Sequence, residues 1–208
     1  IVPVHQMGTD EHGLPYFTMK KLTGTTLLVI LAQTPQLSRP RLLRVFVEIC
    51  QAMEFAHSRG VVHRDLKPAN VMVGELGEAL VMDWGLGLRV GDAAPPAADE
   101  AAPPSLEPDS QLTRDGDVLG TPAYMPPEQA RGERARHGPA SDVYALGAIL
   151  YHALTGRPPY EGPLMRVLMQ VIDGEPPPPV RAAAGKPVPE ELAAICERAM
   201  RRSIEERY

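Results

Sequence analysis

The sequence predicts an α+β fold in which a mostly helical body follows a few short strands. Short apolar runs separated by turn residues recur before Asp83, whereas apolar residues at helical spacing fill the second half of the chain. At 208 residues the chain is long enough for one compact domain, or for one large lobe of a bigger domain. A hydrophobic share of 44% and a charged share of 23% are typical of folded proteins and exclude a wholly disordered or fibrous chain.

The N-terminal segment predicts sheet. Two short apolar runs flank a turn at Asp10 to Gly13, and after a connection containing Gly24 an apolar patch follows at Leu27 to Leu31. We therefore expect two short strands at the start of the chain. Because the chain opens with Ile1 inside the first apolar run, we also expect it to be a fragment of a longer protein.

A long helix and then a strand, turn and strand are expected next. Ser38 is a candidate helix N-cap, and apolar residues recur at helical spacing from there until Gly60. This pattern predicts an amphipathic helix over about residues 39–59. Residues 61–83 alternate short apolar runs with polar clusters, which predicts short strands with polar residues at their ends.

The second half of the chain predicts helices after a flexible insert. Residues 91–111 contain five prolines and five acidic residues without a basic or aromatic residue, so we expect them to be disordered. From Ser141 to a stop at Gly156 the chain is apolar almost all the way round, which predicts a helix buried on every side. Two more helices are expected near 163–173 and 189–202.

Charge, apolar runs and cysteine content indicate which partners and which compartment to expect. A formal net charge of -5 favours neither nucleic acid nor an anionic membrane surface as a partner. No apolar run approaches the roughly 20 residues that cross a bilayer. Cys50 and Cys196 lie far apart in apolar segments, which favours reduced, buried thiols over a disulfide. We therefore expect this chain to be cytoplasmic. The sequence leaves open whether a longer parent protein has a membrane anchor outside these residues.

The loop His63–Asn70, with the sequence HRDLKPAN, is the most informative motif. It places the carboxylate of Asp65, the ammonium of Lys67 and the amide of Asn70 on one short segment. The spacing from Asp65 to Asn70 resembles the catalytic loop of the eukaryotic-like, bacterial-type serine/threonine protein kinases. A lone His-Arg-Asp is more often a surface turn, but here further motifs of the family follow in the expected order.

The resemblance implies the transfer of the γ-phosphoryl group of ATP to serine or threonine hydroxyls of protein substrates. Asp65 would be the catalytic base, and Lys67 would place a positive charge beside the transferring group. Asn70 and Asp83 would supply oxygen ligands to Mg²⁺, and Mn²⁺ fits the same ligands. Asp83 begins an Asp-Trp-Gly sequence, so Trp84 stands where the family usually has phenylalanine.

A second stretch resembles the end of the kinase activation segment. The residues from Gly120 to Glu128, GTPAYMPPE, match the family pattern except that Pro126 replaces the usual alanine or serine. By this resemblance Thr121 bridges the catalytic acid and lysine. Glu128 pairs with a distant arginine near the end of the domain, which in this sequence is Arg207.

Two further positions carry regulatory or supporting roles by the same resemblance. Asp142, in the first turn of the buried helix, would hold the backbone of the loop that contains Asp65. Arg64 would contact a phosphorylated residue of the activation segment. The nearest candidate is Thr113, with Asp115 as a built-in negative charge.

The start of the chain resembles the last strand of a kinase small lobe and its hinge. Met19 would be the gatekeeper, the backbone of Lys20 and Leu22 would meet the adenine of ATP, and Met72 would lie under the ring. A core role for both methionines is about equally expected. The resemblance thus divides the chain into residues 1–22, the last small-lobe strands and hinge, and residues 23–208, the helical C-lobe of a protein-kinase-like fold.

Three features of the family are missing: a Gly-rich phosphate loop, a strand lysine and a helix glutamate. We expect them upstream of Ile1, so that the fragment alone is inactive. A pseudokinase or scaffold that binds partners without phosphoryl transfer is the alternative, although it has no need of a metal-binding set. A small-molecule phosphotransferase is disfavoured because the segment Gly120 to Glu128 resembles the one that forms a peptide-binding platform in the protein kinases. Three histidines outside the HRDLKPAN loop have no metal-ligand spacing and are expected to be structural or exposed: His57, His137 and His152.

Overall fold

The computed structural model describes residues 4–33, 37–84, 88–89 and 122–208. Its strands are β1 (Val4–Thr9), β2 (Pro15–Met19), β3 (Thr25–Thr26), β4 (Val61–Val62), β5 (Val71–Val73), β6 (Ala79–Val81) and β7 (Leu88–Arg89). Its α-helices are α1 (Leu27–Ala32), α2 (Arg39–Ser58), α3 (Pro127–Ala130), α4 (Pro139–Thr155), α5 (Leu164–Asp173), α6 (Val180–Ala183) and α7 (Glu190–Ala199). The 3₁₀ turns are η1 (Pro68–Asn70), η3 (Pro122–Tyr124), η4 (Arg134–Arg136) and η5 (Ile204–Glu206). The mixed α/β architecture agrees with the α+β class expected from the sequence. None of the helices in these ranges is long and apolar enough to span a membrane.

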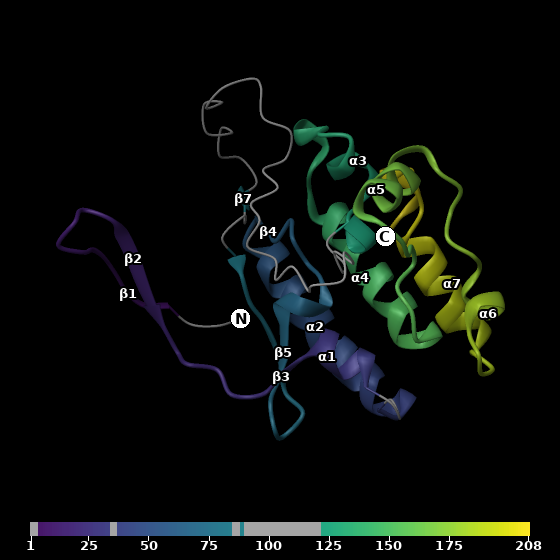
Figure 1. The fold of residues 1–208 in the computed structure, drawn as a ribbon, viewed down its shortest axis with the longest axis horizontal. Coiled ribbons are helices and arrows are strands. Elements are labelled where there is room, and N and C mark those ends of the chain that lie inside the picture. Colours follow the sequence, from purple (N-terminus) through teal and green to yellow (C-terminus); the bar gives the residue numbers. More distant parts are fainter. Residues whose placement is uncertain (1–3, 34–36, 85–87, 90–121) are drawn as a thin grey trace.

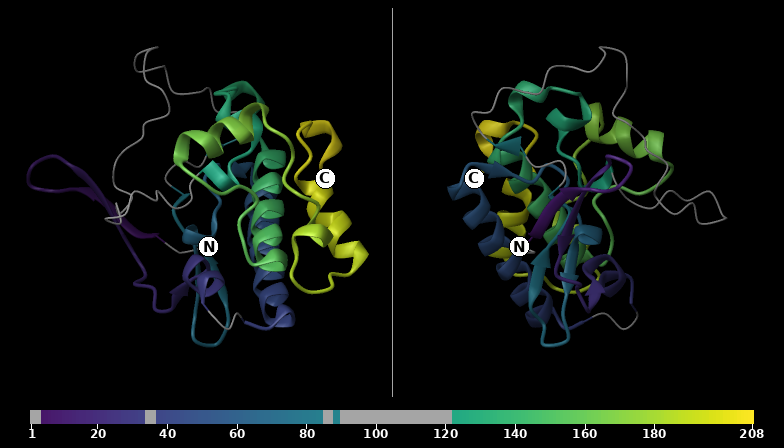
Figure 2. Two further views of the ribbon diagram at one scale, coloured as in Figure 1. Left: turned by 45° about the vertical axis from the view of Figure 1, so that its right-hand side comes forward. Right: turned by 90° about the vertical axis from the view of Figure 1, so that its left-hand side faces the viewer.

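The strands β1 and β2 form an antiparallel hairpin, as the sequence predicts. Its turn is built by Asp10, whose Oδ1 accepts hydrogen bonds from the backbone of His12 and Leu14. Gly13 adopts a φ of 79°, a conformation that glycine takes without steric cost. Figure 1 and the left view of Figure 2 show this hairpin projecting away from the helical body. Its large apolar side chains are therefore exposed: Met7, Leu14, Tyr16, Phe17 and Met19.

A small sheet of β3, β5 and β6 links the hairpin to the helices. The central strand β5 pairs antiparallel with both neighbours and buries Val71 completely, as β6 buries Val81. The helix α2 packs against β6, and Glu48 of α2 accepts a hydrogen bond of 2.7 Å from the backbone of Ala79. A separate two-stranded ladder joins β4 to β7. The contacts of α2 with β6 and Ala79 thereby fix the three-stranded sheet to α2.

The helix α4 is the centre of the helical body. It packs between α2 and α7, as Figures 1 and 2 show. Gly147 allows the close approach to α7, because a Cβ atom there would lie 2.8 Å from the Cβ of Ala199. Gly156 ends the helix with a φ of 80°, the left-handed conformation typical of a helix stop. The prediction of a helix buried on nearly every side is confirmed.

Some element boundaries differ from the sequence expectations. Ser38 precedes α2, but its side chain makes no capping hydrogen bond. The apolar patch at Leu27 to Leu31 forms the helix α1. The short helix α6 was not expected from the sequence. The last helix ends at Ala199 and not near residue 202. Beyond its end, the guanidinium of Arg202 donates to the carbonyls of Gln170, Ile172 and Gly174 at the end of α5.

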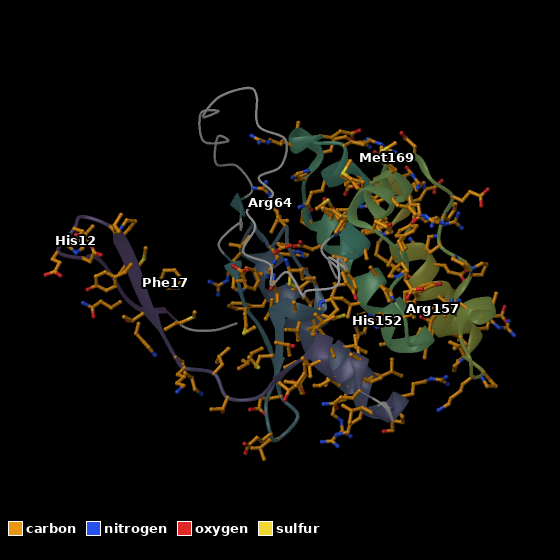
Figure 3. The ribbon with its side chains drawn as sticks, in the orientation of Figure 1. His12, Phe17, Arg64, His152, Arg157 and Met169 are labelled. Atoms are coloured by element: carbon orange, nitrogen blue, oxygen red, sulfur yellow. The ribbon has the colours of Figure 1, made fainter. Side chains whose placement is uncertain are left out.

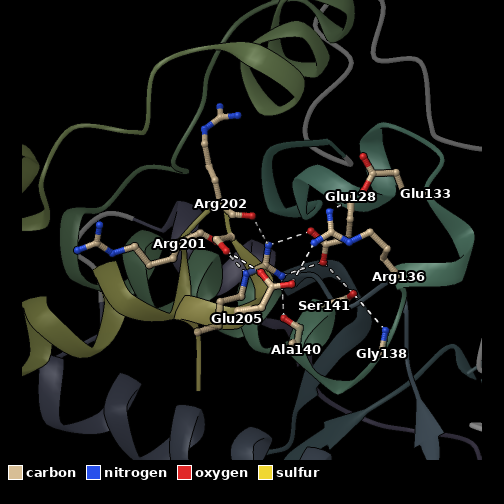
Figure 4. Close-up of polar contacts among 11 residues, drawn as sticks. Glu128, Glu133, Arg136, Gly138, Ala140, Ser141, Arg201, Arg202 and Glu205 are labelled. Carbon is tan, nitrogen blue, oxygen red and sulfur yellow. Dashed lines mark hydrogen bonds and ion pairs between the residues drawn. The ribbon is translucent and has the colours of Figure 1, made fainter.

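A buried ion pair ties the end of the chain to α3. Arg207 donates from Nη1 and Nη2 to the two carboxylate oxygens of Glu128, each at 2.8 Å. Ser141 donates to the same carboxylate, and Arg207 also donates to the backbone of Ala140. Figure 4 shows this network joining residues 128–141 to the end of the chain, and Glu128 and Arg207 are 79 positions apart. The pairing expected from the family resemblance is found.

The electrostatics of this pair follow from its burial. The side chains of Glu128 and Arg207 are 2% and 0% exposed. Burial disfavours the carboxylate, but the hydrogen bonds and positive charge of Arg207 outweigh it and lower the pKa of Glu128. A buried charge left without its partner is costly, so each of the two residues depends on the other.

Replacing Arg207 by methionine should destabilise the fold. Arg207→Met leaves the Glu128 carboxylate buried without its counter-ion, so we expect the free energy of unfolding to fall by about 3–5 kcal/mol. The matched control is Arg201→Met, an exposed arginine of the same segment, which should change it by less than about 0.5 kcal/mol. Urea unfolding followed by circular dichroism measures both, and equal effects of the two variants would contradict the buried-pair account.

Acid should weaken the same interaction. Because the pKa of folded Glu128 lies below its usual value of 4.5, the pair stabilises the fold fully above pH 4.5 and loses this contribution as the pH falls through the lowered value. In Glu128→Gln the group no longer titrates. The unfolding free energy of the variant should therefore decline less than that of the wild type between about pH 5 and pH 3. Parallel declines in urea titrations at each pH would show that Glu128 does not contribute.

Candidate active site

Asp142 holds the loop that contains the HRDLKPAN sequence. Its carboxylate is 1% exposed in the first turn of α4, where the helix dipole favours a negative charge. Oδ2 accepts from the backbone N–H of His63 at 2.8 Å, and Oδ1 accepts from that of Arg64 at 2.9 Å. The ring of His57, on α2, donates to the same carboxylate at 2.8 Å. One buried carboxylate thus joins α2, α4 and the loop.

His63 connects the loop to the strand end that carries Asp83. Its Nδ1 accepts from the backbone of Asp65, and its Nε2 donates to the carbonyl of Met82 at 2.8 Å. A neutral ring with the proton on Nε2 satisfies both bonds. The backbone N–H of Met82 donates in turn to the carbonyl of Asn70. Met82 is therefore held on both sides, which places Asp83 beside the end of the loop.

The three polar side chains of the loop come together. Asp65 Oδ2 lies 2.8 Å from Lys67 Nζ and accepts from Asn70 Nδ2 at 3.0 Å. Asn70 Nδ2 also donates to the backbone carbonyl of Asp65. The carboxylate and the ammonium are 19% and 21% exposed, so both reach solvent from fixed positions. Oδ1 of Asp65 makes no hydrogen bond to another described residue and can accept one from a ligand.

Asp83 and Trp84 follow β6 directly. Asp83 is exposed and adopts a φ of 60°, an uncommon conformation for a residue other than glycine. The indole of Trp84 donates to the carbonyl of Val81 at 3.1 Å, and its ring lies 4.6 Å from that of His63. The bulkier residue at this position is thus fixed to its own strand and to the loop, and it supports the backbone at Asp83.

The oxygen donors near this loop suit a hard cation. Asn70 uses its amide nitrogen on Asp65, which turns its amide oxygen to the other side, and Asp83 offers an exposed carboxylate. Mg²⁺ prefers oxygen ligands and keeps several waters, so two protein ligands are sufficient. Within the described residues no group of three or more His, Cys, Asp or Glu side chains could hold a metal. A site for a softer metal such as zinc is not formed there.

Some expected site residues lie apart or outside the described ranges. Met19 belongs to the exposed hairpin with Lys20 just beyond it, whereas Met72 pairs with Thr26 in the three-stranded sheet. The structure does not bring the two methionines into one sheet. Thr113, Thr121 and the insert 91–111 lie outside the described residues.

Arg64 occupies a special position in the loop. Its φ is 70°, and its buried Nε has no hydrogen-bond partner among the described residues. His137 lies near enough for the charge of Arg64 to act on it: burial first, and then Arg64, lowers the pKa of His137. The guanidinium of Arg64 therefore has an unsatisfied nitrogen within the described part of the structure.

Two histidine contacts were missed in the sequence. His57 was expected to be structural or exposed, and it is structural: it donates to Asp142, a partner that the sequence did not indicate. His152 hydrogen-bonds the hydroxyl of Tyr124 at 2.7 Å, and burial lowers its pKa to about 4 while it raises that of Tyr124. No local pattern signals either contact, because each joins segments that are distant in the sequence.

The role of Asp142 can be tested by a single substitution. Asp142→Asn replaces one acceptor oxygen by a donor, so one N–H of the loop loses its partner, and we expect the free energy of unfolding to fall by about 2–3 kcal/mol. Asp173→Asn, at the exposed end of α5, is the matched control and should change it by less than about 0.5 kcal/mol. Urea unfolding measures both. Equal stability of Asp142→Asn and the wild type would contradict this anchoring.

Comparison with known proteins agrees with this geometry. The family model described as "Protein kinase domain" matches residues 1–207. The chain is 36% identical over 221 residues to serine/threonine-protein kinase PknD of Protochlamydia amoebophila, a match that covers 100% of the chain and 22% of that protein. It is 34% identical over 212 residues to serine/threonine-protein kinase PknB of Mycolicibacterium smegmatis, covering 100% of the chain and 31% of that protein.

A third relative gives a similar match. The probable serine/threonine-protein kinase PknB of Bifidobacterium longum is 34% identical over 200 residues, which cover 96% of the chain and 26% of that protein. The chain thus spans between 22% and 31% of the length of these curated relatives. The chain belongs to the protein kinase family, and within it to the bacterial serine/threonine-protein kinases.

Proposed function

We propose that this protein transfers the γ-phosphoryl group of ATP to serine or threonine hydroxyls of protein substrates, with Asp65 as the catalytic base. The observation that carries the proposal is the geometry of the Asp65 carboxylate. Lys67 and Asn70 both hold its Oδ2, so Oδ1 is left for the substrate hydroxyl. A base in general acid–base catalysis must lie within hydrogen-bond reach of the proton that it accepts.

The remaining residues position and stabilise charge. Lys67 provides a fixed positive charge next to Asp65, at the place where a transferring phosphoryl group would lie. The anchoring of the loop by Asp142 keeps this arrangement rigid before any substrate binds. Catalysis of this kind depends mainly on positioning and electrostatics, because the protein forms no covalent bond to the phosphoryl group.

Asn70 and Asp83 would hold Mg²⁺ in this proposal. When bound, the ion would neutralise the negative charge of the nucleotide phosphates. The donor chemistry supports this assignment, since both side chains present oxygens and Met82 holds the two segments together. Mn²⁺ accepts the same ligands and is expected to substitute.

The other assignments complete the proposed kinase. Residues 1–22 would be small-lobe strands and hinge, and residues 23–208 the C-lobe. Met19, Met72 and the backbone of Lys20 and Leu22 would contact the adenine. Thr121 of the activation segment would bridge Asp65 and Lys67, and Arg64 of the HRDLKPAN loop would contact phosphorylated Thr113. The match to a protein kinase domain over residues 1–207 supports the assignment of both parts to one kinase domain.

Removing the proposed base should abolish phosphoryl transfer. We expect Asp65→Asn in the full-length protein to lower the rate by about 10²–10⁴-fold, because an amide cannot accept the hydroxyl proton. Radiolabelled ATP and casein measure the rate, and thermal unfolding by circular dichroism shows whether the variant is folded. The matched control is Glu75→Gln, an exposed carboxylate in the turn between β5 and β6, which should leave the rate unchanged.

The outcome separates the proposal from its alternative. Labelling by folded Asp65→Asn at the wild-type rate would rule out Asp65 as the base. A folded wild-type protein that transfers no label to any substrate, itself included, would instead favour a pseudokinase that binds partners without chemistry.

A further inference from the structure

Trp84 departs from the family pattern directly after the proposed metal ligand Asp83. The usual phenylalanine offers a ring without a hydrogen-bond donor, whereas an indole offers both. The indole N–H of Trp84 donates to the carbonyl of Val81 at 3.1 Å. Its ring lies 4.6 Å from that of His63, with 55° between the two planes. The donor that distinguishes tryptophan from phenylalanine is therefore used, and its acceptor is only three residues back in the chain.

The carbonyl of Val81 is not used by the ladder between β5 and β6. Val81 stands opposite Val71 in that ladder, and the backbone N–H of Met82, the next residue, donates to the carbonyl of Asn70 at 2.9 Å. Because hydrogen-bonded and non-hydrogen-bonded pairs alternate along an antiparallel ladder, the carbonyl of Val81 points away from β5. Val81 is 0% exposed, so this carbonyl is also shielded from water. The indole of Trp84 thus satisfies a buried acceptor, which would be unfavourable without a partner.

Asp83 lies between two residues that are each fixed by hydrogen bonds. On one side, the carbonyl of Met82 accepts from His63 Nε2 at 2.8 Å, and on the other, Trp84 is tied back to β6. Asp83 has a φ of 60°, as Arg64 of the loop, labelled in Figure 3, has one of 70°. A residue other than glycine keeps such a conformation only where its surroundings enforce it. The hydrogen bond of Trp84 is therefore part of what holds the backbone at Asp83.

The position of the Asp83 carboxylate depends on this backbone. The side chain is exposed, so packing around it contributes little to its placement, and the direction of its Cα–Cβ bond follows from the backbone conformation. The apparent affinity of a site falls in proportion to the fraction of molecules that adopt the binding conformation. A donor that raises this fraction strengthens metal binding without contacting the ion.

We propose that Trp84 is a positioning residue for Asp83, and that its indole N–H holds the Asp83 backbone in the metal-binding conformation before an ion binds. The inference rests on the proposed function, because the ion is the one assigned to Asn70 and Asp83. It adds a residue that sets the affinity for the divalent cation from outside the ligand set, at the position where this chain departs from its family.

Binding of Mn²⁺ to the full-length protein tests this inference without phosphoryl transfer. The complex of Mn²⁺ with a non-hydrolysable ATP analogue is titrated with protein, and the enhanced relaxation of water protons reports the bound ion. Trp84→Phe keeps a ring next to His63 but removes the donor, so we expect the complex to bind about tenfold more weakly. Binding of a fluorescent form of the same nucleotide in EDTA should not change, because Asp83 acts through the ion.

Tryptophan analogues separate the N–H group from the ring. In a full-length protein in which Trp84 is the only tryptophan, benzothienylalanine keeps the bicyclic ring but has sulfur in place of the N–H, whereas 5-fluorotryptophan keeps the N–H. We expect benzothienylalanine to weaken Mn²⁺ binding as Trp84→Phe does. The protein with 5-fluorotryptophan should bind the ion as the protein with tryptophan does.

A core substitution separates positioning from a general loss of stability. Ile49→Val shortens a side chain of α2 that is 0% exposed, so it should lower the midpoint of thermal unfolding. It should leave the affinity for the Mn²⁺ complex unchanged, because Ile49 is not connected to Asp83 by any of the hydrogen bonds described above. Circular dichroism verifies that each variant is folded at the temperature of the titration.

Three results would overturn the inference and leave the proposed function in place. They are equal affinity of the wild type and Trp84→Phe for the Mn²⁺ complex, binding by the benzothienylalanine protein as tight as that by the tryptophan protein, and equal weakening in Ile49→Val. In each of them the wild type still binds the ion. A folded wild-type protein whose affinity for the nucleotide does not respond to Mn²⁺ would instead remove the proposed metal site at Asn70 and Asp83, and this inference with it.

Discussion

The carboxylate of Asp142 is the contact on which the proposed active site depends. It is buried at the start of the most buried helix, and its three donors come from the ring of His57 and from the backbone of His63 and Arg64. A buried carboxylate is unfavourable unless such donors and the helix dipole compensate for lost hydration. The same bonds that satisfy Asp142 therefore fix the loop that presents Asp65.

His63 connects the loop held by Asp142 to the second polar segment, which consists of Met82, Asp83 and Trp84. His63 donates to the carbonyl of Met82, Asn70 accepts from its N–H, and Trp84 packs against the ring of His63. Arg64 and Asp83 have φ values of 70° and 60°, which for such residues cost roughly 1–3 kcal/mol each and persist only where the surroundings enforce them. Both strained residues flank the proposed chemistry, and both lie next to backbone groups that this network holds.

Local patterns were sufficient to predict much of the fold but only part of the site. The hairpin, α2, α4 and the HRDLKPAN motif follow from periodicity, turn residues and a short spacing, and all are in place. The contacts of His57 with Asp142 and of His152 with Tyr124 could not be predicted, because they join residues 85 and 28 positions apart.

Metal binding at Asp83 is the most direct test of the assembled site, and Trp84 provides the probe. In a full-length protein with every other tryptophan replaced by phenylalanine, paramagnetic Mn²⁺ with ATP would be titrated while the emission of Trp84 is recorded. The account predicts saturable quenching that is lost in Asp83→Asn and retained in the control Glu75→Gln. Quenching of Asp83→Asn with the wild-type affinity would contradict the proposed metal site and, with it, the proposed arrangement for phosphoryl transfer.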